Sequence, residues 1–344
     1  EAGIIAASNF AGYLFGALSA PFVRLFFGEI GSMKCCLVLA LLSLFACILP
    51  WGFWWLVFWR ALLGGLVGIM MIYCLAIATR FAPKGKLGAA TGIVYTGVGI
   101  GIFLSGSLIP WLLSFSLEIA WLGIASIGLV AFMVAFWGWT SPIPEDNTAI
   151  NLSQQKFDWN STVVGLISAR TFFSLGLIPH TIYWVDYLVR GLGNDIDFGG
   201  MHWALFGCGA ILGTYLWGRL ADQIGFRFGL GLAFAAVSAG IALPVIYTTD
   251  WTLIFSSLVV GAQPGLTAIL SGRFHQLVGA DRMAAVWRMS ALVATVIQAI
   301  GAYGYVTLFS MFDDYTAIFL AGSVSMVLGA LLALTMKKSE YVQE

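Results

Sequence analysis

The short segment Gly218–Arg227 places charged and glycine residues between two long apolar runs, in the order G-R-L-A-D-Q-I-G-F-R. Gly218 lets two helices approach closely and Gly225 permits a tight reversal, because glycine has no Cβ atom. Asp222 offers a carboxylate to an arginine or to the N-terminus of a neighbouring helix. With Arg219 and Arg227 beside it, the segment is predicted to be a charged gating turn that holds neighbouring helices together. The alternative is an ordinary polar loop.

Two arginines lie inside apolar runs, where a charge is costly. Arg60 is about seven residues, or ~10 Å, from the end of its run, and Arg170 is about ten residues, or ~14 Å, from the nearer end of its own. Arg60 is too deep for an ordinary anchor at the membrane surface, and Arg170 is expected to face water, an acid or a substrate. For Arg60 the alternative is a side chain that reaches back to the membrane surface. No Asp or Glu lies at comparable depth, so an anionic ligand, or a carboxylate on a helix absent from this chain, is the expected partner of Arg170.

The run around Arg170 is also the most polar of the long ones. Pro179 removes a backbone donor and kinks the helix, and the side chains beyond it share one helical face, namely His180, Tyr183, Trp184 and Tyr187. In one interpretation this face lines a pathway, and in the other it packs against neighbouring helices. His180 is accordingly either a proton carrier or a residue packed among aromatics. Gln263, beside Pro264, is a weaker candidate for the same pathway, because a proline frees backbone carbonyls.

The composition is that of a membrane protein. The 344 residues are 60% hydrophobic and 9% charged, with a mean hydropathy of +0.94 and a net charge of zero. A soluble domain could not solvate such a surface, and the apolar runs match the ~20 residues that cross a bilayer. The five cysteines include no C-x-x-C pair and the three histidines are scattered, so neither disulfides nor a metal site is expected. No G-K-[ST] follows the glycine-rich runs, and no cofactor or nucleic-acid partner is predicted.

The apolar runs predict eleven transmembrane spans, at 3–23, 35–50, 53–80, 88–113, 119–139, 161–189, 200–220, 227–247, 252–275, 282–309 and 316–336. The longest polar stretch, 140–160, is predicted to be a linker between an N-terminal half, 1–139, and a C-terminal half, 161–344. Lysine and arginine gather at alternate connections, which predicts a cytoplasmic side for those connections and for the C-terminus. Five spans precede the linker and six follow it. A first helix is therefore predicted to be missing from the chain.

Glycine patterns predict close packing and an internal repeat. Glycines one helical turn apart are expected to bring helices together at five places: Gly12 and Gly16, Gly64 and Gly68, Gly88 and Gly92, Gly97 and Gly101, and Gly209 and Gly213. The connection Arg24–Lys34 is weakly similar to the turn described first when Gly31 is aligned with Gly225. In that alignment Gly28 replaces Asp222, so the N-terminal turn lacks the carboxylate.

Several of these segments resemble the major facilitator superfamily of transporters. Gly218–Arg227 resembles its G-x-L-a-D-r-x-G-r loop, and Leu56–Gly65 resembles the L-x-x-x-R-x-x-x-G pattern of its fourth helix. Leu177–Gly193, followed by Trp203–Gly207, resembles the YbfB/YjiJ branch, whose members are bacterial inner-membrane proteins. The Gly-Pro element of the antiporter signature is absent from the glycine-rich run before Pro110.

The resemblance implies an all-α membrane protein with two six-helix halves and rocker-switch alternating access. It implies a multi-pass protein of the inner membrane, with a cavity lined by the spans that hold Arg60, Arg170 and Gln263. The implied function is secondary active transport of a small molecule, with an anionic substrate and proton coupling left open. A membrane-embedded enzyme would need a catalytic cluster of His, Asp or Glu, and the sequence predicts none. A transporter-like sensor or binding protein is the remaining alternative.

Overall fold

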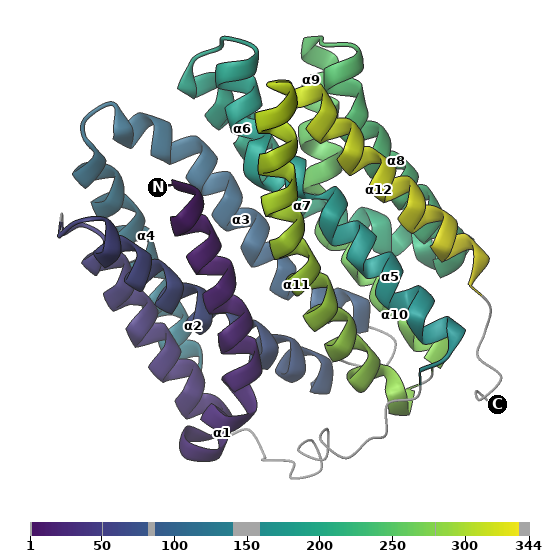
Figure 1. Ribbon diagram of the computed structural model, residues 1–344. Helices are drawn as coiled ribbons and strands as arrows, with labels where there is room; N and C mark the ends of the chain where they lie inside the picture. The colour runs from purple at the N-terminus through teal and green to yellow at the C-terminus, as the bar shows by residue number, and fades with distance from the viewer. Residues whose placement is uncertain (1, 50, 82–86, 140–158, 279, 337–344) are drawn as a thin grey trace. The chain divides into compact units, whose positions relative to one another are not determined.

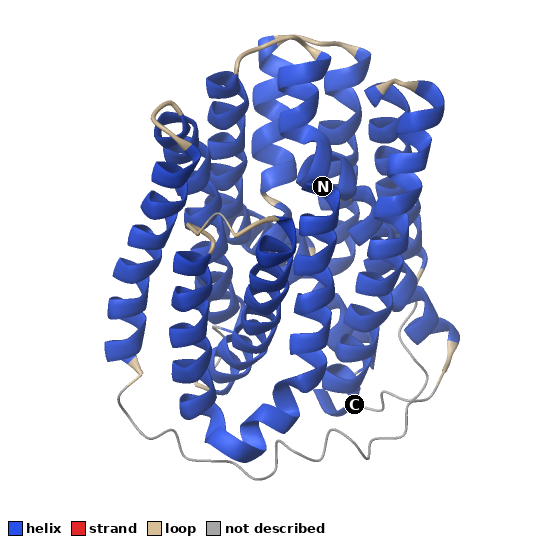
Figure 2. Cartoon of the chain, turned by 60° about the vertical axis from the view of Figure 1, so that its left-hand side comes forward, coloured by secondary structure: helices blue, strands red, loops and turns tan. Residues whose placement is uncertain are grey.

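The computed structural model describes residues 2–49, 51–81, 87–139, 159–278 and 280–336, and all regular elements in these ranges are helical (Figure 1, Figure 2). Those before the linker are α1 (Ala2–Ala46), α2 (Phe53–Arg80), α3 (Leu87–Leu113) and α4 (Leu117–Gly138). Those after it are α5 (Ser161–Gly176), η2 (Pro179–Tyr183), α6 (Trp184–Asp186), η3 (Tyr187–Gly191), α7 (Ile196–Ile224), α8 (Phe226–Ile246), α9 (Asp250–Gly261), α10 (Gln263–Val278), α11 (Ala280–Phe312) and α12 (Tyr315–Thr335). The linker predicted at 140–160 lies outside the described residues except at its ends.

Several helices begin at a polar side chain that caps the first turn. A side-chain oxygen accepts a hydrogen bond from a backbone N–H of the first turn at Ser116, Asn160, Asp195, Thr249 and Asp314. Such caps satisfy donors that have no partner within the helix, and each is worth about 1 kcal/mol. The apolar runs therefore start as helices where these short polar residues interrupt them.

Nine helical stretches in the described part of the chain are long and apolar enough to cross a membrane. The stretch Ala7–Ala46 is counted once, although the left-handed backbone of Gly28 (φ 65°) breaks α1 within it. The helix α7 is not among the nine. The all-helical membrane fold predicted from the sequence is confirmed, whereas the count of eleven spans and the missing first helix remain predictions.

The chain forms two compact units, and the first comprises residues 1–84 and 108–151. Its main packing is between α1 and α2, where glycines bring the two backbones together. A Cβ atom at Gly12 would collide with the backbone of Ala61, and one at Gly64 would collide with that of Asn9. The amide of Asn9 also donates to the carbonyl oxygen of Arg60 at 2.9 Å. The close packing predicted for the glycine pairs of α1 and α2 is confirmed.

The reversal inside α1 corrects the predicted internal repeat. Positive φ values occur at Gly28 (65°) and at Gly225 (83°), and both residues lie where one helical run ends and the next begins. The alignment of Gly31 with Gly225 is therefore wrong by three positions. The residue that reverses the chain must adopt a left-handed backbone, which glycine does at little cost, and in the first unit that residue is Gly28.

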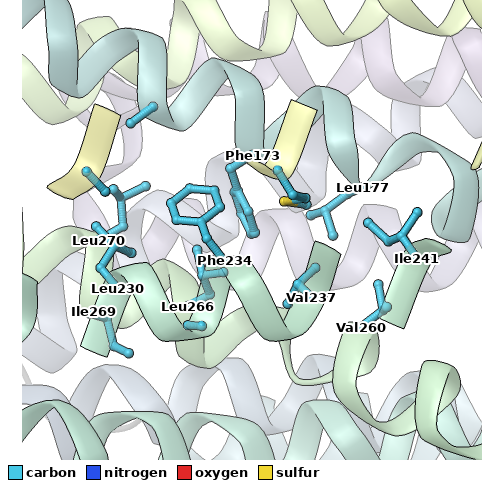
Figure 3. Packing of buried hydrophobic residues seen from close by; sticks show 14 of the residues in the cluster. Phe173, Leu177, Leu230, Phe234, Val237, Ile241, Val260, Leu266, Ile269 and Leu270 are labelled. Carbon is cyan, nitrogen blue, oxygen red and sulfur yellow. The ribbon is translucent and has the colours of Figure 1, made fainter. Parts of the chain in front are cut away.

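The second unit comprises residues 85–107 and 152–344 and contains the larger core. Phe173 of α5 meets Phe234 of α8 edge to face, with ring centroids 6.1 Å apart (Figure 3). Leu230, Leu266 and Ile269, from α8 and α10, are fully buried in the same cluster. Lipid is as apolar as these side chains, so the stability of this core comes from close packing more than from removal of water.

Glycines on α7 bring it into contact with α9. A Cβ atom at Gly209 would collide with the backbone of Leu258, and one at Gly213 would lie 2.5 Å from Cα of Ala262. The predicted close packing of this pair is confirmed.

At Gly218 a Cβ atom would meet no described atom within 4 Å, so the prediction of close helix approach there is wrong. The same holds for the predicted pair Gly97 and Gly101, whose Cβ positions are also open. Spacing alone does not indicate which face of a helix has a neighbour.

Two alanine substitutions on α7 separate packing from helix propensity. Gly213→Ala is expected to lower the free energy of unfolding by about 1–3 kcal/mol, because the new methyl group must displace Ala262. Gly218→Ala is the matched control, and it is expected to raise stability by up to about 1 kcal/mol, since the site is open and alanine favours helix. Thermal unfolding of both variants in detergent measures the difference. Equal melting temperatures would contradict the packing argument.

Candidate functional site

The helix that follows the linker is broken into four elements near its middle. The α-helix α5 ends at Gly176, and the π-helical turns η2 and η3 flank the short element α6. Pro179 begins η2 because it has no N–H to continue the α-helical pattern. In η3 the backbone N–H of Leu192 donates to the carbonyl of Tyr187, five residues back, at 2.9 Å. The predicted break at Pro179 is confirmed, and it is a π-helical turn of the kind often found at functional sites.

His180 lies inside the second unit, packed among aromatic rings. Its ring stacks on Trp184 with centroids 4.5 Å apart, and its Nε2 atom is 2.7 Å from Oγ of Ser256 on α9. The side chain of His180 is 1% exposed and that of Trp184 is fully buried. Phe319 of α12 meets the His180 ring edge to face at 5.3 Å. Of the two interpretations that the sequence left open, this environment favours packing, and the proton-carrier role remains a prediction.

A second histidine joins this cluster through the next serine. Oγ of Ser257 accepts a hydrogen bond from the indole N–H of Trp184 at 3.1 Å and lies 2.9 Å from Nδ1 of His202 on α7. The sequence analysis missed both serines and His202. The signal available was the Ser-Ser pair within an apolar run, since two adjacent hydroxyls buried in a helix require partners.

Arg170 is held by an aromatic ring on α11. Its guanidinium carbon lies 3.8 Å from the ring centroid of Trp287, and its Nη1 donates to Oγ of Ser290 at 3.4 Å. A cation over an indole face is stabilised by the ring quadrupole, by about 2 kcal/mol when water is excluded. The sequence analysis expected water, an acid or a ligand beside Arg170 and did not foresee Trp287. The side chain of Arg170 is only partly buried.

The two other candidates for a pathway, Gln263 and Arg60, lie in different units of the chain. Gln263 begins α10 after α9 has ended at Gly261, so the predicted break at Gln263-Pro264 is confirmed. The backbone carbonyl oxygen of Gln263 accepts a hydrogen bond from the hydroxyl of Thr267 at 3.3 Å. Arg60 belongs to the first unit, where its side chain is partly buried and forms no ion pair with a described residue.

The turn Gly218–Arg227 reverses the chain as predicted, but its charged side chains have different hydrogen-bond partners from those expected. Gly225 reverses the chain with φ 83°. Arg219 donates to the hydroxyl of Tyr215 at 2.8 Å, and Nε of Arg227 donates to the carbonyl of Leu334 at 2.8 Å. Asp222 is exposed and pairs with no arginine in the described part of the chain. The carboxylate of this turn is thus accessible, while its two neighbouring arginines are engaged elsewhere.

The end of α12 is held by two arginines. Arg227 bonds to the carbonyl of Leu334, and Nη2 of Arg273 donates to the carbonyl of Met336 at 2.9 Å. The last carbonyls of a helix lack partners within it, and cations are favoured there by the helix dipole. Arg227 therefore acts as a structural tie between the turn and α12.

An acidic residue that the sequence analysis did not single out ties α6 to α12. The hydroxyl of Tyr315 donates to Oδ2 of Asp186 at 2.5 Å, and Nη1 of Arg190 lies 3.2 Å from Oδ1 of the same carboxylate. Arg190 is 80% exposed, so this ion pair contributes little to stability. The tyrosine contact fixes the C-terminal part of the broken helix against the start of α12.

The fold has a counterpart among solved transporters. The crystal structure of the human organic anion transporter MFSD10 (TETRAN) superposes with a TM-score of 0.73 at 14% sequence identity, covering 96% of this chain and 83% of that one. At this level of identity the likeness concerns the fold alone.

The chain belongs to the family described as the uncharacterised MFS-type transporter YbfB, whose model matches residues 1–334. It is 27% identical over 236 residues to the uncharacterised MFS-type transporter YbcL of Bacillus subtilis, an alignment that covers 66% of this chain and 55% of YbcL. It is 25% identical over 332 residues to a Haemophilus influenzae protein named "Putative metabolite transport protein", covering 89% of this chain and 77% of that protein. The predicted superfamily and branch are confirmed, and the protein is a multi-pass membrane protein of this family.

Proposed function

We propose that this protein is a secondary transporter that moves a small organic anion across the bacterial inner membrane by alternating access of its two halves. The observation that carries the proposal is Arg170, a cation inside a membrane helix whose guanidinium is stacked on Trp287 at 3.8 Å. The ring covers one side of the guanidinium, and the N–H groups lie along the guanidinium edge, where Nη1 donates to Oγ of Ser290. Those groups match the two oxygens of a carboxylate.

The indole ring of Trp287 favours one kind of anion. An indole that holds the arginine in one plane also presents a flat surface beside the bound carboxylate. A planar organic acid would bind the arginine edge and contact this ring at once, which an inorganic anion would not do. The human structural relative is an organic anion transporter, and its name supports a test of the same chemical class here.

A flux assay with paired substrates tests the proposal. The purified protein is placed in proteoliposomes and given small organic acids together with their neutral amides. We expect uptake or exchange of one or more acids and none of the matched amides. Each assay is run with and without an imposed pH gradient, which decides whether transport is coupled to protons. Uptake of amides and acids at equal rates would contradict an arginine-bound anion.

The charged turn provides a prediction about the rate of transport. Asp222→Asn removes the carboxylate charge and keeps its shape. If the carboxylate holds one access state by contacting a helix terminus or an arginine, transport should slow by roughly two- to thirty-fold, the range of a charge at a helix end. The free energy of unfolding should stay within about 0.5 kcal/mol, because the residue is exposed.

Initial transport rates at matched protein amounts measure the effect. Asp197→Asn, at an exposed site in the first turn of the same helix α7, is the control and should leave the rate unchanged. A normal rate in the Asp222→Asn protein would remove the gating role from this turn.

A further inference from the structure

Arg170 has a second point of contact on α11 besides the indole ring. Trp287 and Ser290 are three residues apart in that helix, so their side chains lie on the same face of it. The ring centroid of Trp287 is 3.8 Å from the guanidinium carbon, and Oγ of Ser290 accepts from Nη1 at 3.4 Å. Contact with a ring holds the guanidinium by its face, whereas a hydrogen bond to one nitrogen is directional. The serine therefore constrains how the edge of the guanidinium is turned.

The hydroxyl of Ser290 can accept from Arg170 but has no hydrogen to offer an anion. It donates to the backbone carbonyl of Trp287 at 2.7 Å. A serine hydroxyl has one hydrogen and two lone pairs, so with this bond made the oxygen presents only lone pairs. Ser290 is also fully buried, which keeps water away from them. An effect of Ser290 on a bound anion must therefore pass through Arg170.

The indole ring that faces Arg170 is supported by a neighbouring helix. Phe274 of α10 is fully buried and meets Trp287 edge to face, with ring centroids 5.3 Å apart. Both partners of the arginine are thus fixed by contacts of their own, one to Phe274 and one to a carbonyl of α11. A binding group that is already held in its bound orientation loses less conformational freedom when the ligand arrives.

We propose that Ser290 is a positioning residue, which holds the guanidinium of Arg170 in the orientation that receives the carboxylate of the substrate. This inference rests on the proposed function, in which Arg170 binds an organic anion. Ser290→Ala removes only the hydroxyl group. Arg170 then keeps its charge and its contact with Trp287 but is free to turn its edge, so anion binding should weaken without being lost.

Nitrogen NMR of the arginine side chains tests the orientation without any ligand. The protein is labelled with ¹⁵N-arginine in detergent micelles, and the Arg170 signals are assigned by their loss in Arg170→Lys. We expect separate signals for Nη1 and Nη2, because a bond to one of them slows rotation about the Cζ–Nε bond. The two signals should merge in Ser290→Ala. Merged signals in the unmodified protein, or separate signals in Ser290→Ala, would overturn the proposal.

A second serine on α11 provides the matched control. The hydroxyl of Ser310 donates to the carbonyl of Thr307 at 2.8 Å, which is the same bond, three residues back, that Ser290 makes to Trp287. Ser310→Ala should leave the two Nη signals of Arg170 separate. Merging in this variant as well would mean that any loss of a hydroxyl from α11 frees the arginine, which would contradict a specific role for Ser290.

Equilibrium binding of benzoate, a planar carboxylate, shows whether the orientation matters to an anion. Ser290→Ala should weaken binding by about three- to ten-fold, the range of one hydrogen bond, and Ser310→Ala should leave it unchanged. In an Arg170→Lys background the same Ser290→Ala change should alter affinity by less than about two-fold, because the group through which the serine acts is absent.

Equal losses in the two backgrounds, or no loss in Ser290→Ala, would overturn the positioning role, since a purely structural serine acts regardless of what stands at position 170. Failure of benzoate to bind the unmodified protein would count against the proposed anion contact itself. The NMR signals would still decide whether Ser290 orients Arg170, so the two failures can be told apart.

Discussion

Replacing Arg170 by alanine is expected to reduce the transport of the anionic substrate by about ten- to hundred-fold, the range of a lost charge-assisted hydrogen bond. Alanine also removes the cation that stacks on Trp287. Arg170→Lys should restore only part of the activity, because an ammonium group cannot present two parallel donors to a carboxylate and fits the indole face less well.

Binding and folding must be measured on the same purified protein to interpret this result. Equilibrium binding of an organic acid should weaken in both variants. Both should remain folded, and the alanine variant should lose at most about 2 kcal/mol of unfolding free energy, for the missing contact with Trp287. Arg190→Ala is the control, because that arginine is 80% exposed and outside the site. A structural arginine would behave differently: the alanine variant would lose folded protein, and whatever remained would bind the acid with unchanged affinity. That outcome would remove Arg170 from the substrate site.

Breaking the ion pair of the first unit is expected to have the largest effect on stability. Arg24 and Glu29 flank the reversal at Gly28, with Nη1 and Oε1 3.1 Å apart and side chains 14% and 4% exposed. Arg24→Leu leaves a buried carboxylate without this cation and should lower the free energy of unfolding by about 3–5 kcal/mol. The double variant Arg24→Leu, Glu29→Leu should recover most of the loss, because two apolar side chains leave no buried charge.

Denaturant unfolding of the two single variants and the double variant forms a double-mutant cycle that isolates the pair. Arg190→Leu breaks the exposed pair with Asp186 and should cost less than about 1 kcal/mol, which makes it the matched control. Additive losses in the double variant would contradict a buried, mutually dependent pair.

Properties that depend on a single residue type were predictable from the sequence. Glycine at 225 predicted the reversal, proline at 179 predicted the break, and the length of the apolar runs predicted a helical membrane fold. Partners far away in the chain were not predictable. Nothing in the sequence around Arg170 indicates that its neighbour is Trp287, because the contact depends on how α5 packs against α11.

The wrong predictions for Gly218 and for the internal repeat have the same cause, which is that neighbours and backbone conformation cannot be deduced from residue type. Gly213 and Gly218 lie on one helix and have the same chemistry, yet only the first has a neighbouring backbone against it. The alignment of the repeat failed because a motif was matched by residue identity, whereas the chain reverses at the glycine with a left-handed backbone, Gly28. The face predicted for His180, Trp184 and Tyr187 is kept despite the π-helical turns, since all three rings meet Phe319 of α12.

Each π-helical turn is equivalent to a one-residue insertion that the helix has accommodated without moving its ends. In an α-helix every residue advances the side chains by about 100°, so an insertion would normally rotate everything beyond it by that angle. A wider turn between Pro179 and Tyr183 confines the extra residue locally. Chains of different length at this point could therefore keep Arg170 and Asp186 on their present faces. Relatives that differ by a single residue here should be aligned with a gap inside η2, and not at the loops.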